Sequence, residues 1–106
     1  MVRSRPIRGE IWLIDLGLAQ KTRPVVILSV QPMDDERVVV TYVARTTSIR
    51  GTRFEVLHEG RGFKPGAFDA QSIGTVPTAR LIKRIAVVDS DTMSRVENAV
   101  RTWLEI

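Results

Sequence analysis

Two apolar runs near the start of the chain, Ile11–Leu16 and Pro24–Val30, constrain the possible folds most strongly. Both are rich in Val, Ile and Leu and are bounded by turn-forming residues, which is typical of β-strands. A short basic loop that ends in Lys21-Thr22-Arg23 joins them. Because both runs are almost continuously apolar, both faces of the predicted strands should be buried.

Arg23 occupies a constrained position at the start of the second run. The ring of Pro24 disfavours the helical region for the residue before it, so the backbone of Arg23 should be extended. We therefore expect its side chain at the rim of the sheet, where the apolar strand begins. A cation held there suits a phosphodiester, because a guanidinium can donate two parallel hydrogen bonds to phosphate oxygens.

The remaining strands follow from alternating or β-branched patterns separated by turn residues. Turns or loops are expected at Gln31–Glu36 and Arg45–Arg53, and one helical turn at Pro77–Leu81, where proline suits a helix start. Ala67–Val76 is expected to be a shorter extended piece. The predicted strands after the first two are Arg37–Ala44, Phe54–Glu59, Ala67–Val76 and Ile82–Val88.

A helix is predicted at Asp91–Leu104, after the N-cap cluster Asp89-Ser90-Asp91. Its apolar residues recur every three to four positions and form one face, which makes Trp103 a packing residue. The fold class is therefore mainly β with a C-terminal helix, arranged as a small barrel-like domain with a helical cover. A second copy of the chain is a candidate cover for one face of the sheet.

The chain of 106 residues is expected to form one domain, 1–106, in which residues 1–7 are a flexible basic leader. There is no cysteine and one histidine, His58, so neither a disulfide framework nor a conventional metal cluster is predicted. The acidic run Asp34-Asp35-Glu36 is interpreted as a solvated turn. No cofactor is expected. No apolar run approaches the length of about 18 residues that a membrane span needs, so we expect a cytoplasmic protein.

The positive charge of the chain comes mostly from arginine, and this is unusual. The net charge is +4, and thirteen of the sixteen basic residues are arginine. Arginine binds phosphate with a planar fork that lysine cannot copy. The composition therefore favours nucleic acid or an acidic protein as a partner, with a merely solubilising surface as the alternative.

Three segments resemble the MazF/PemK family of toxin endoribonucleases (mRNA interferases). These are Arg8-Gly9-Glu10-Ile11-Trp12, Arg23-Pro24-Val25-Val26-Ile27-Leu28-Ser29, and Thr46–Val56, which matches the family's T-[TS]-x-x-[KR]-G-x-x-x-E-V pattern without a gap. The resemblance covers nearly the whole chain and weakens after Gly60.

The resemblance implies an SH3-like small barrel that forms a homodimer with the RNA site at or near the subunit interface. It also implies a sequence-specific, metal-independent endoribonuclease that cuts single-stranded mRNA by attack of the 2′-hydroxyl and leaves a 2′,3′-cyclic phosphate. The partners implied are single-stranded RNA and a cognate antitoxin, usually an acidic protein whose C-terminal tail lies across the RNA site.

By the same resemblance, Arg23 and Thr46 match the family's catalytic arginine and threonine. A guanidinium stays protonated, so the role expected for Arg23 is stabilisation of the phosphorane-like transition state and not that of a base. The hydroxyl of Thr46 can bond a phosphate oxygen or the 2′-hydroxyl. Without the resemblance, Arg23 could be a structural arginine and Thr46 part of a polar loop. The candidate RNA-binding residues are Lys21, Thr47, Ser48, Arg50 and Arg53, with Thr47 also a reserve for Thr46.

Two segments depart from the family pattern and leave the general acid and base unassigned. The first loop, Gly17-Leu18-Ala19-Gln20, is short and carries no acid where many relatives have a glutamate. Gln71-Ser72-Ile73-Gly74-Thr75 stands where relatives often read D-Q-[IV]-[RK]-T. His58 is not included in the predicted site, because the family has no catalytic histidine there.

The alternative is a protein of the same fold that does not cleave RNA. It would bind RNA without cutting it, or poison DNA gyrase as the structurally related CcdB proteins do. In the latter case the relevant surface would be the C-terminal helix, with Trp103-Leu104-Glu105-Ile106 at its end.

Overall fold

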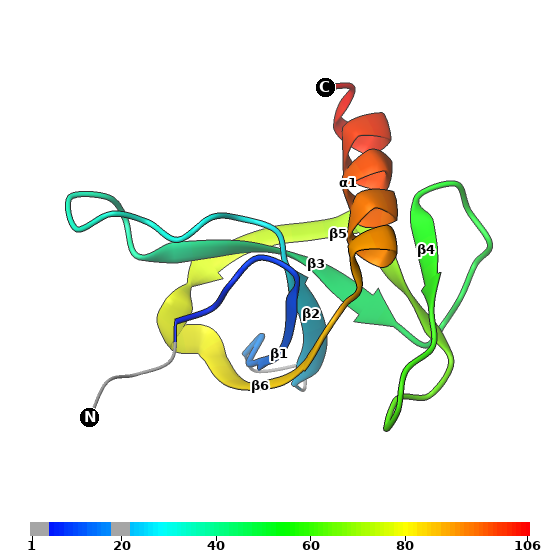
Figure 1. Ribbon diagram of the computed structural model, residues 1–106, viewed down its shortest axis with the longest axis horizontal. Coiled ribbons are helices and arrows are strands. Elements are labelled where there is room, and N and C mark those ends of the chain that lie inside the picture. Colours follow the sequence, from blue (N-terminus) through cyan, green and yellow to red (C-terminus); the bar gives the residue numbers. More distant parts are fainter. Residues whose placement is uncertain (1–4, 18–21) are drawn as a thin grey trace.

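The computed structural model describes residues 5–17 and 22–106, which form a mainly β domain with a C-terminal helix (Figure 1). This arrangement confirms the predicted fold class. The elements are β1 (Glu10–Ile14), β2 (Arg23–Ile27), β3 (Val39–Thr46), β4 (Glu55–His58), β5 (Gly66–Pro77), the 3-10 turn η1 (Thr78–Arg80), β6 (Leu81–Val87) and α1 (Ser90–Leu104).

The strands form one antiparallel sheet in the order β4-β5-β3-β2-β1-β6. The sheet twists and curls, so β6 returns beneath β1 and gives a barrel-like shape (Figure 1). In the described part of the chain β4 and β6 are the edge strands, so the barrel is not closed.

Both faces of the central strands are buried, as the apolar runs predict. On one face, Ile11, Val26 and Val43 pack with Phe68 and the apolar side of α1. Since successive side chains of a strand point to opposite faces, their neighbours form a second core on the other face. That second core contains Trp12, Ile14, Val25, Ile27, Val40, Tyr42 and Ala44. Each buried Val or Ile contributes about 1.5–3 kcal/mol relative to exposure.

Helix α1 stands against β4 and β5 (Figure 1) and begins one residue before the predicted start. Asp89 caps it, because its carboxylate accepts a hydrogen bond of 2.7 Å from the backbone N–H of Thr92. The helix ends at Glu105, which has a left-handed backbone with φ 58°. Trp103 packs edge-on against Phe54, with ring centroids 5.2 Å apart, but is 43% exposed.

The extended piece predicted at Ala67–Val76 is confirmed as β5, which adds one residue at each end and is the longest strand, not a shorter one. It spans Gly66–Pro77 and pairs with both β3 and β4, and these two long-range partners sustain it through an irregular sequence. Between the pairs Val43↔Ile73 and Ala44↔Asp69 the register shifts, which leaves residues 70–72 as a bulge.

The first strands end earlier than predicted, at Ile14 and Ile27, and polar side chains explain both ends. The Asp15 carboxylate accepts the N–H of Gly17 at 2.9 Å, which turns the chain. The Ser29 hydroxyl accepts the N–H of Thr41 at 2.9 Å in place of a ladder partner. By contrast, β3 is longer at its end than predicted. It continues past Ala44 to Thr46, because its last two residues pair with β5.

Candidate functional site

The start of β2 and the end of β3 lie beside each other and bring Arg23 and Thr46 together. The register of β2 and β3 pairs Val25 with Ala44 and Val26 with Val43, and its extension by two residues places Arg23 opposite Thr46. Directly opposed residues of antiparallel strands share a face, so the two side chains project from the same side of the sheet. We call this pair the Arg23–Thr46 corner.

The guanidinium of Arg23 is held in place at this corner. Its Nη2 donates a hydrogen bond of 3.1 Å to the carbonyl oxygen of Arg45, the residue before Thr46. The side chain is half-buried. Among the residues that the structure describes, this bond uses one of its five N–H donors, and the others can reach a phosphate oxygen.

Thr46 ends β3 with its hydroxyl turned into the following loop. Its Oγ1 accepts a hydrogen bond of 3.0 Å from the backbone N–H of Ser48. The bond uses an oxygen lone pair and not the hydroxyl proton, which can still be donated to a ligand oxygen. Thr47, Ser48 and Arg50 follow on the exposed loop.

Glu55 organises this loop, a role that the sequence reading did not assign. Its carboxylate accepts hydrogen bonds from the backbone N–H of Arg50, at 3.0 and 3.1 Å, and of Thr52 at 2.9 Å. These bonds, the one from Arg50 foremost, lower the pKa of Glu55. The signal was present, because Glu55 is the glutamate of the T-[TS]-x-x-[KR]-G-x-x-x-E-V pattern.

The two other predicted RNA-binding residues are placed differently. The guanidinium of Arg53 lies 4.6 Å from the centre of the Phe54 ring, beside α1, and so turns away from the loop that carries Ser48 and Arg50. Lys21 lies outside the described residues.

Two carboxylates share the face of the sheet that carries the corner. Asp69 is opposite Ala44, and Glu55 is opposite Asp69. Ala44 and Thr46 are two positions apart on β3, so all of these side chains belong to the same face. The sequence did not reveal Asp69 as a neighbour, because its position depends on the β3–β5 register.

The altered segment Gln71–Thr75 has a packing explanation at Gly74. A Cβ added there would lie 2.5 Å from the Tyr42 hydroxyl oxygen and 2.7 Å from the ring. Tyr42 therefore occupies the space that any side chain at position 74 would need.

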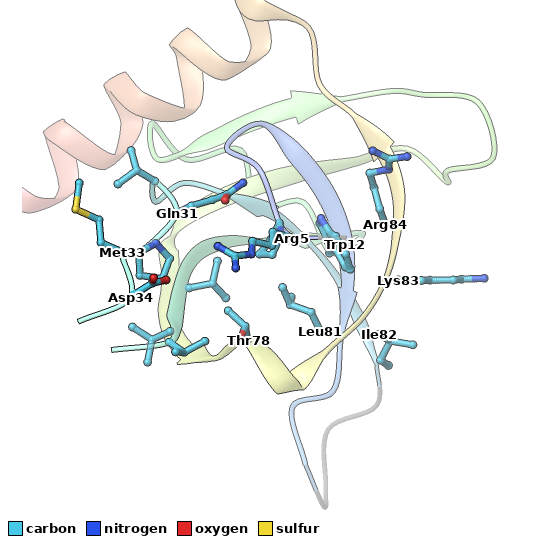
Figure 2. A pocket seen from close by; sticks show the side chains of 16 residues that line it. Arg5, Trp12, Gln31, Met33, Asp34, Thr78, Leu81, Ile82, Lys83 and Arg84 are labelled. Atoms are coloured by element: carbon cyan, nitrogen blue, oxygen red, sulfur yellow. The ribbon is translucent and has the colours of Figure 1, made fainter. Parts of the chain in front are cut away.

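A cavity of about 750 Å³ lies at the opposite end of β3 from Thr46, between β1, β3 and β6 (Figure 2). Trp12, Val40 and Leu81 contribute to its apolar wall. Arg5 and Arg84 line it as well, and Lys83 points outward from its rim (Figure 2). The cavity is therefore separate from the Arg23–Thr46 corner.

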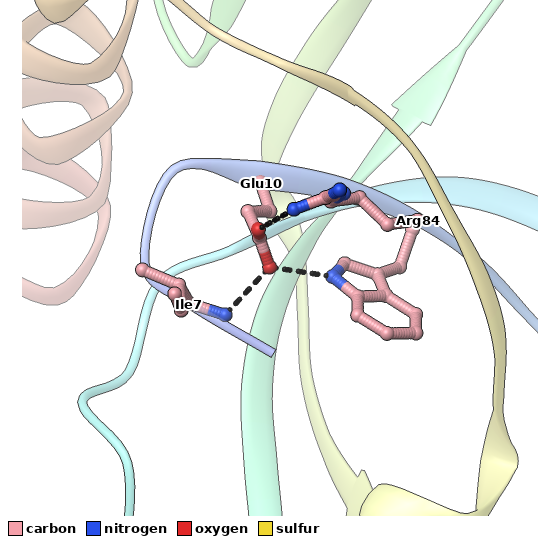
Figure 3. Close-up of polar contacts among 4 residues, drawn as sticks. Ile7, Glu10 and Arg84 are labelled. Carbon is pink, nitrogen blue, oxygen red and sulfur yellow. Dashed lines mark hydrogen bonds and ion pairs between the residues drawn. The ribbon is translucent and has the colours of Figure 1, made fainter. Parts of the chain in front are cut away.

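Glu10 is a buried carboxylate with a structural role. It accepts hydrogen bonds from Ile7 N at 2.8 Å, Trp12 Nε1 at 3.0 Å and Arg84 Nη1 at 3.0 Å (Figure 3). Burial acts to raise the pKa of Glu10, but the bonds from Trp12, Ile7 and Arg84 outweigh burial and lower it. The network joins the segment before β1 to β6.

The sequence model of a protein family, the PemK-like, MazF-like toxins of type II toxin-antitoxin systems, matches residues 7–104 of this chain. The chain belongs to this toxin family. Residues 7–104 include the Arg23–Thr46 corner, its loop and α1, so the match extends past Gly60, where the recognisable motifs weaken.

Solved structures of MazF toxins share the fold. An endoribonuclease in complex with its cognate antitoxin, from a mycobacterial species, has 25% identity and a TM-score of 0.82, covering 96% of this chain and 97% of that one. The Mycobacterium tuberculosis toxin MazF-mt6 has 22% identity and a TM-score of 0.79, covering 92% and 97%. MazF from Deinococcus radiodurans has 19% identity and a TM-score of 0.82, covering 98% and 100%.

The described residues form neither a metal-binding cluster nor a membrane-spanning helix. Across residues 5–17 and 22–106, no three side chains of the metal-ligating types gather into a group that could hold an ion. In the same part of the chain, α1 is too short and too polar to cross a bilayer, and no other helix could do so.

Proposed function

We propose that this protein is a sequence-specific, metal-independent endoribonuclease toxin that cleaves single-stranded mRNA. The observation that carries the proposal is the Arg23–Thr46 corner, where a fixed cation and a hydroxyl share one face of the sheet. Membership of the PemK-like, MazF-like toxin family supports it. The similarity to an endoribonuclease of mycobacterial origin supports it further.

The chemistry proposed is transesterification within the RNA. The 2′-hydroxyl oxygen attacks the adjacent phosphorus and loses its proton, the bond from phosphorus to the 5′-oxygen breaks, and that oxygen gains a proton. The products are a 2′,3′-cyclic phosphate and a 5′-hydroxyl end. Arg23 stabilises the extra negative charge that develops on the phosphoryl oxygens, and Thr46 donates a hydrogen bond to one of them or orients the 2′-hydroxyl.

The exposed loop after Thr46 is proposed to bind the strand. Ser48 and Arg50 lie there, and the bonds to Glu55 keep the loop in a defined shape. RNA in an A-form duplex hides its base edges in a deep groove, so a single strand is the substrate that a surface loop can read.

The direct test is incubation of the purified protein with a long RNA in EDTA, followed by mapping of the new ends. We expect cuts within a short common sequence, with 2′,3′-cyclic phosphate ends. Intact RNA from folded protein would overturn the proposal. Gyrase inhibition by the same preparation would instead favour the CcdB-like alternative, for which Trp103, Leu104 and Ile106 at the end of α1 are exposed.

We further propose a homodimer that a cognate antitoxin neutralises. Large apolar side chains are exposed around the cavity and on β6, which is typical of a surface that becomes covered. They are Val30, Met33, Val38, Ile82 and Val87. Light scattering at micromolar concentration should give twice the mass of 11.9 kDa, and a monomer at that concentration would contradict the dimer.

A further inference from the structure

Arg45 is a buried cation directly behind the Arg23–Thr46 corner. It is 4% exposed and belongs to β3, where it is opposite Phe68 of β5. Neighbouring residues of a strand point to opposite faces, so the Arg45 side chain leaves the sheet on the far side from that of Thr46. A buried guanidinium must be hydrogen-bonded, and its partners show what it holds together.

Within residues 5–17 and 22–106, the partners of the Arg45 guanidinium come from the β4 end and the loop that leads to β5. Its Nε donates to the ring nitrogen Nδ1 of His58 at 2.9 Å. Its Nη2 donates to the carbonyl oxygens of His58, at 2.9 Å, and of Lys64, at 2.6 Å. The guanidinium also lies 4.8 Å from the centre of the Phe63 ring.

The same residue carries the hydrogen bond that fixes Arg23, through its backbone. The Arg45 carbonyl accepts Nη2 of Arg23 on one side, while the Arg45 side chain is tied down on the other. The packing here leaves no space for a side chain at Gly66, where a Cβ would lie 2.5 Å from the Thr46 carbonyl oxygen and 2.6 Å from Arg45 Nη1. A shift of Arg45 is therefore expected to move the carbonyl that holds Arg23.

His58 accepts this hydrogen bond only while Nδ1 is unprotonated. Its ring packs against those of Phe63 and Phe68, with centroids 5.3 and 4.9 Å away. Protonation would turn Nδ1 into a donor that faces the Arg45 N–H and would place a second positive charge beside the guanidinium.

We propose that Arg45 is a positioning residue for the Arg23–Thr46 corner and that protonation of His58 releases it, so that RNA cleavage is switched off in acid. The inference rests on the proposed nuclease function. It adds a residue pair, Arg45 and His58, on the face of the sheet opposite that of Thr46.

The charges around His58 set the direction of this pH effect. Arg45 on β3 faces it, Asp89 acts from the N-cap of α1, and Glu59 and Lys64 of the adjoining loop are exposed. Burial lowers the pKa of His58 from its ordinary 6.5, the charge of Arg45 lowers it further, and Asp89 opposes both. The unprotonated, bonded form therefore persists through neutral pH and is lost only as the pH falls below 6.5.

The chain contains one histidine, so the imidazole signal in an NMR spectrum belongs to His58. We expect the backbone amide signals of Thr46 and Arg23 to shift with the same midpoint as the His58 ring. In Arg45→Met this shared midpoint should disappear. The proposal would be overturned if the amide chemical shifts of Thr46 and Arg23 in the wild type do not change as His58 titrates.

Cleavage kinetics provide the second measurement. Arg45→Met should lower kcat by up to about 100-fold, the cost of a misplaced catalytic group, with KM nearly unchanged. Arg61→Met, a change at an exposed arginine, is the matched control. His58→Asn keeps a hydrogen-bond acceptor that does not titrate, so it should retain activity at neutral pH and resist acid better than the wild type.

The outcomes separate this inference from the proposed function. Identical pH profiles for the wild type and His58→Asn would overturn the role of His58, and a wild-type kcat for Arg45→Met would overturn that of Arg45. Shared NMR midpoints in a protein that cuts no RNA at any pH would refute the nuclease and leave the coupling of His58 to the corner established. The NMR titration of the wild type decides the coupling even if a variant fails to fold.

Discussion

At the scale of single residues, the proposed chemistry depends on two side chains that the sheet brings together. Arg23 is fixed by the Arg45 carbonyl, and Thr46 is oriented by the N–H of Ser48. Neither residue belongs to a core cluster, and the surrounding strands hold both. Preorganised groups of this kind stabilise developing charge without reorganising during the reaction.

The hydroxyl of Thr46 is tested by Thr46→Val, which keeps the shape and removes the donor. A hydrogen bond to a charged group contributes about 1.5–3 kcal/mol, so kcat should fall about 10- to 100-fold without loss of folding. The readout is the cleavage rate of a saturating RNA, with Thr102→Val on α1 as the control. Wild-type turnover by Thr46→Val would remove Thr46 from the site.

Glu10 is expected to affect stability and its pH dependence. Glu10→Gln weakens the bonds to Trp12, Ile7 and Arg84, so unfolding in urea at pH 7 should show a loss of about 1–3 kcal/mol. Because the pKa of Glu10 is lowered in the folded state, its contribution is complete above the ordinary 4.5 and lost as the pH falls through the folded value.

The stability difference between wild type and Glu10→Gln should therefore shrink in acid. Glu59→Gln, a change at an exposed position, is the matched control. A gap between wild type and Glu10→Gln that stays constant below pH 4.5 would contradict the assigned network.

At the scale of elements, the sequence predicted what local patterns determine. Helix α1 was expected within one residue of its start, because its apolar spacing and its cap at Asp89 are local signals. The partners of β5 could not be predicted, since its pairing with β3 and β4 joins residues far apart in the sequence. The family resemblance singled out Arg23 and Thr46, but the register that places them opposite each other is a property of the folded sheet.

The same distinction explains which neighbours of the site the sequence reading missed. Arg45 lies on β3 and His58 ends β4, and β5 lies between these two strands in the sheet. Only the pairing of β3 and β4 with β5 brings the two residues into contact. Glu55 had a sequence signal but no partner, because a carboxylate that accepts backbone N–H groups is visible only in three dimensions.

The loop between β3 and β4 provides a prediction at this scale. Glu55→Gln loses the charge that strengthens its bonds to the loop, so the amides of Arg50 and Thr52 should exchange with deuterium about tenfold faster or more. RNA affinity should weaken in parallel. Unchanged exchange at both amides would show that Glu55 does not organise the loop, and Glu59→Gln is again the control.

At the scale of the whole molecule, a net charge of +4 made largely of arginine predicts salt-dependent binding to RNA. For single strands the logarithm of the affinity falls with the logarithm of the salt concentration by about 0.7 per phosphate contact. Arg50→Ala should reduce this slope by about 0.7, whereas Arg101→Ala on α1 should leave it unchanged. Affinity that is constant across a wide range of salt would contradict a basic binding surface.

The fold also separates the site from the other conspicuous surface. The Arg23–Thr46 corner lies at one end of β3, and the cavity of Figure 2 lies at the other. A partner could therefore cover the exposed apolar side chains around the cavity without entering the corner. The proposed dimer, formed through these side chains, leaves the corner uncovered, whereas the family resemblance implies an RNA site at or near the subunit interface.

The central claim, that the Arg23–Thr46 corner performs the cleavage, is tested most directly by one rate constant. Single-turnover cleavage of a defined RNA by Arg23→Ala should be slower than by the wild type by about 100- to 1000-fold, the usual cost of removing a preorganised donor. Arg37→Ala, which removes an exposed cation from the turn before β3, should cleave at the wild-type rate. Cleavage by folded Arg23→Ala at the wild-type rate would contradict the claim.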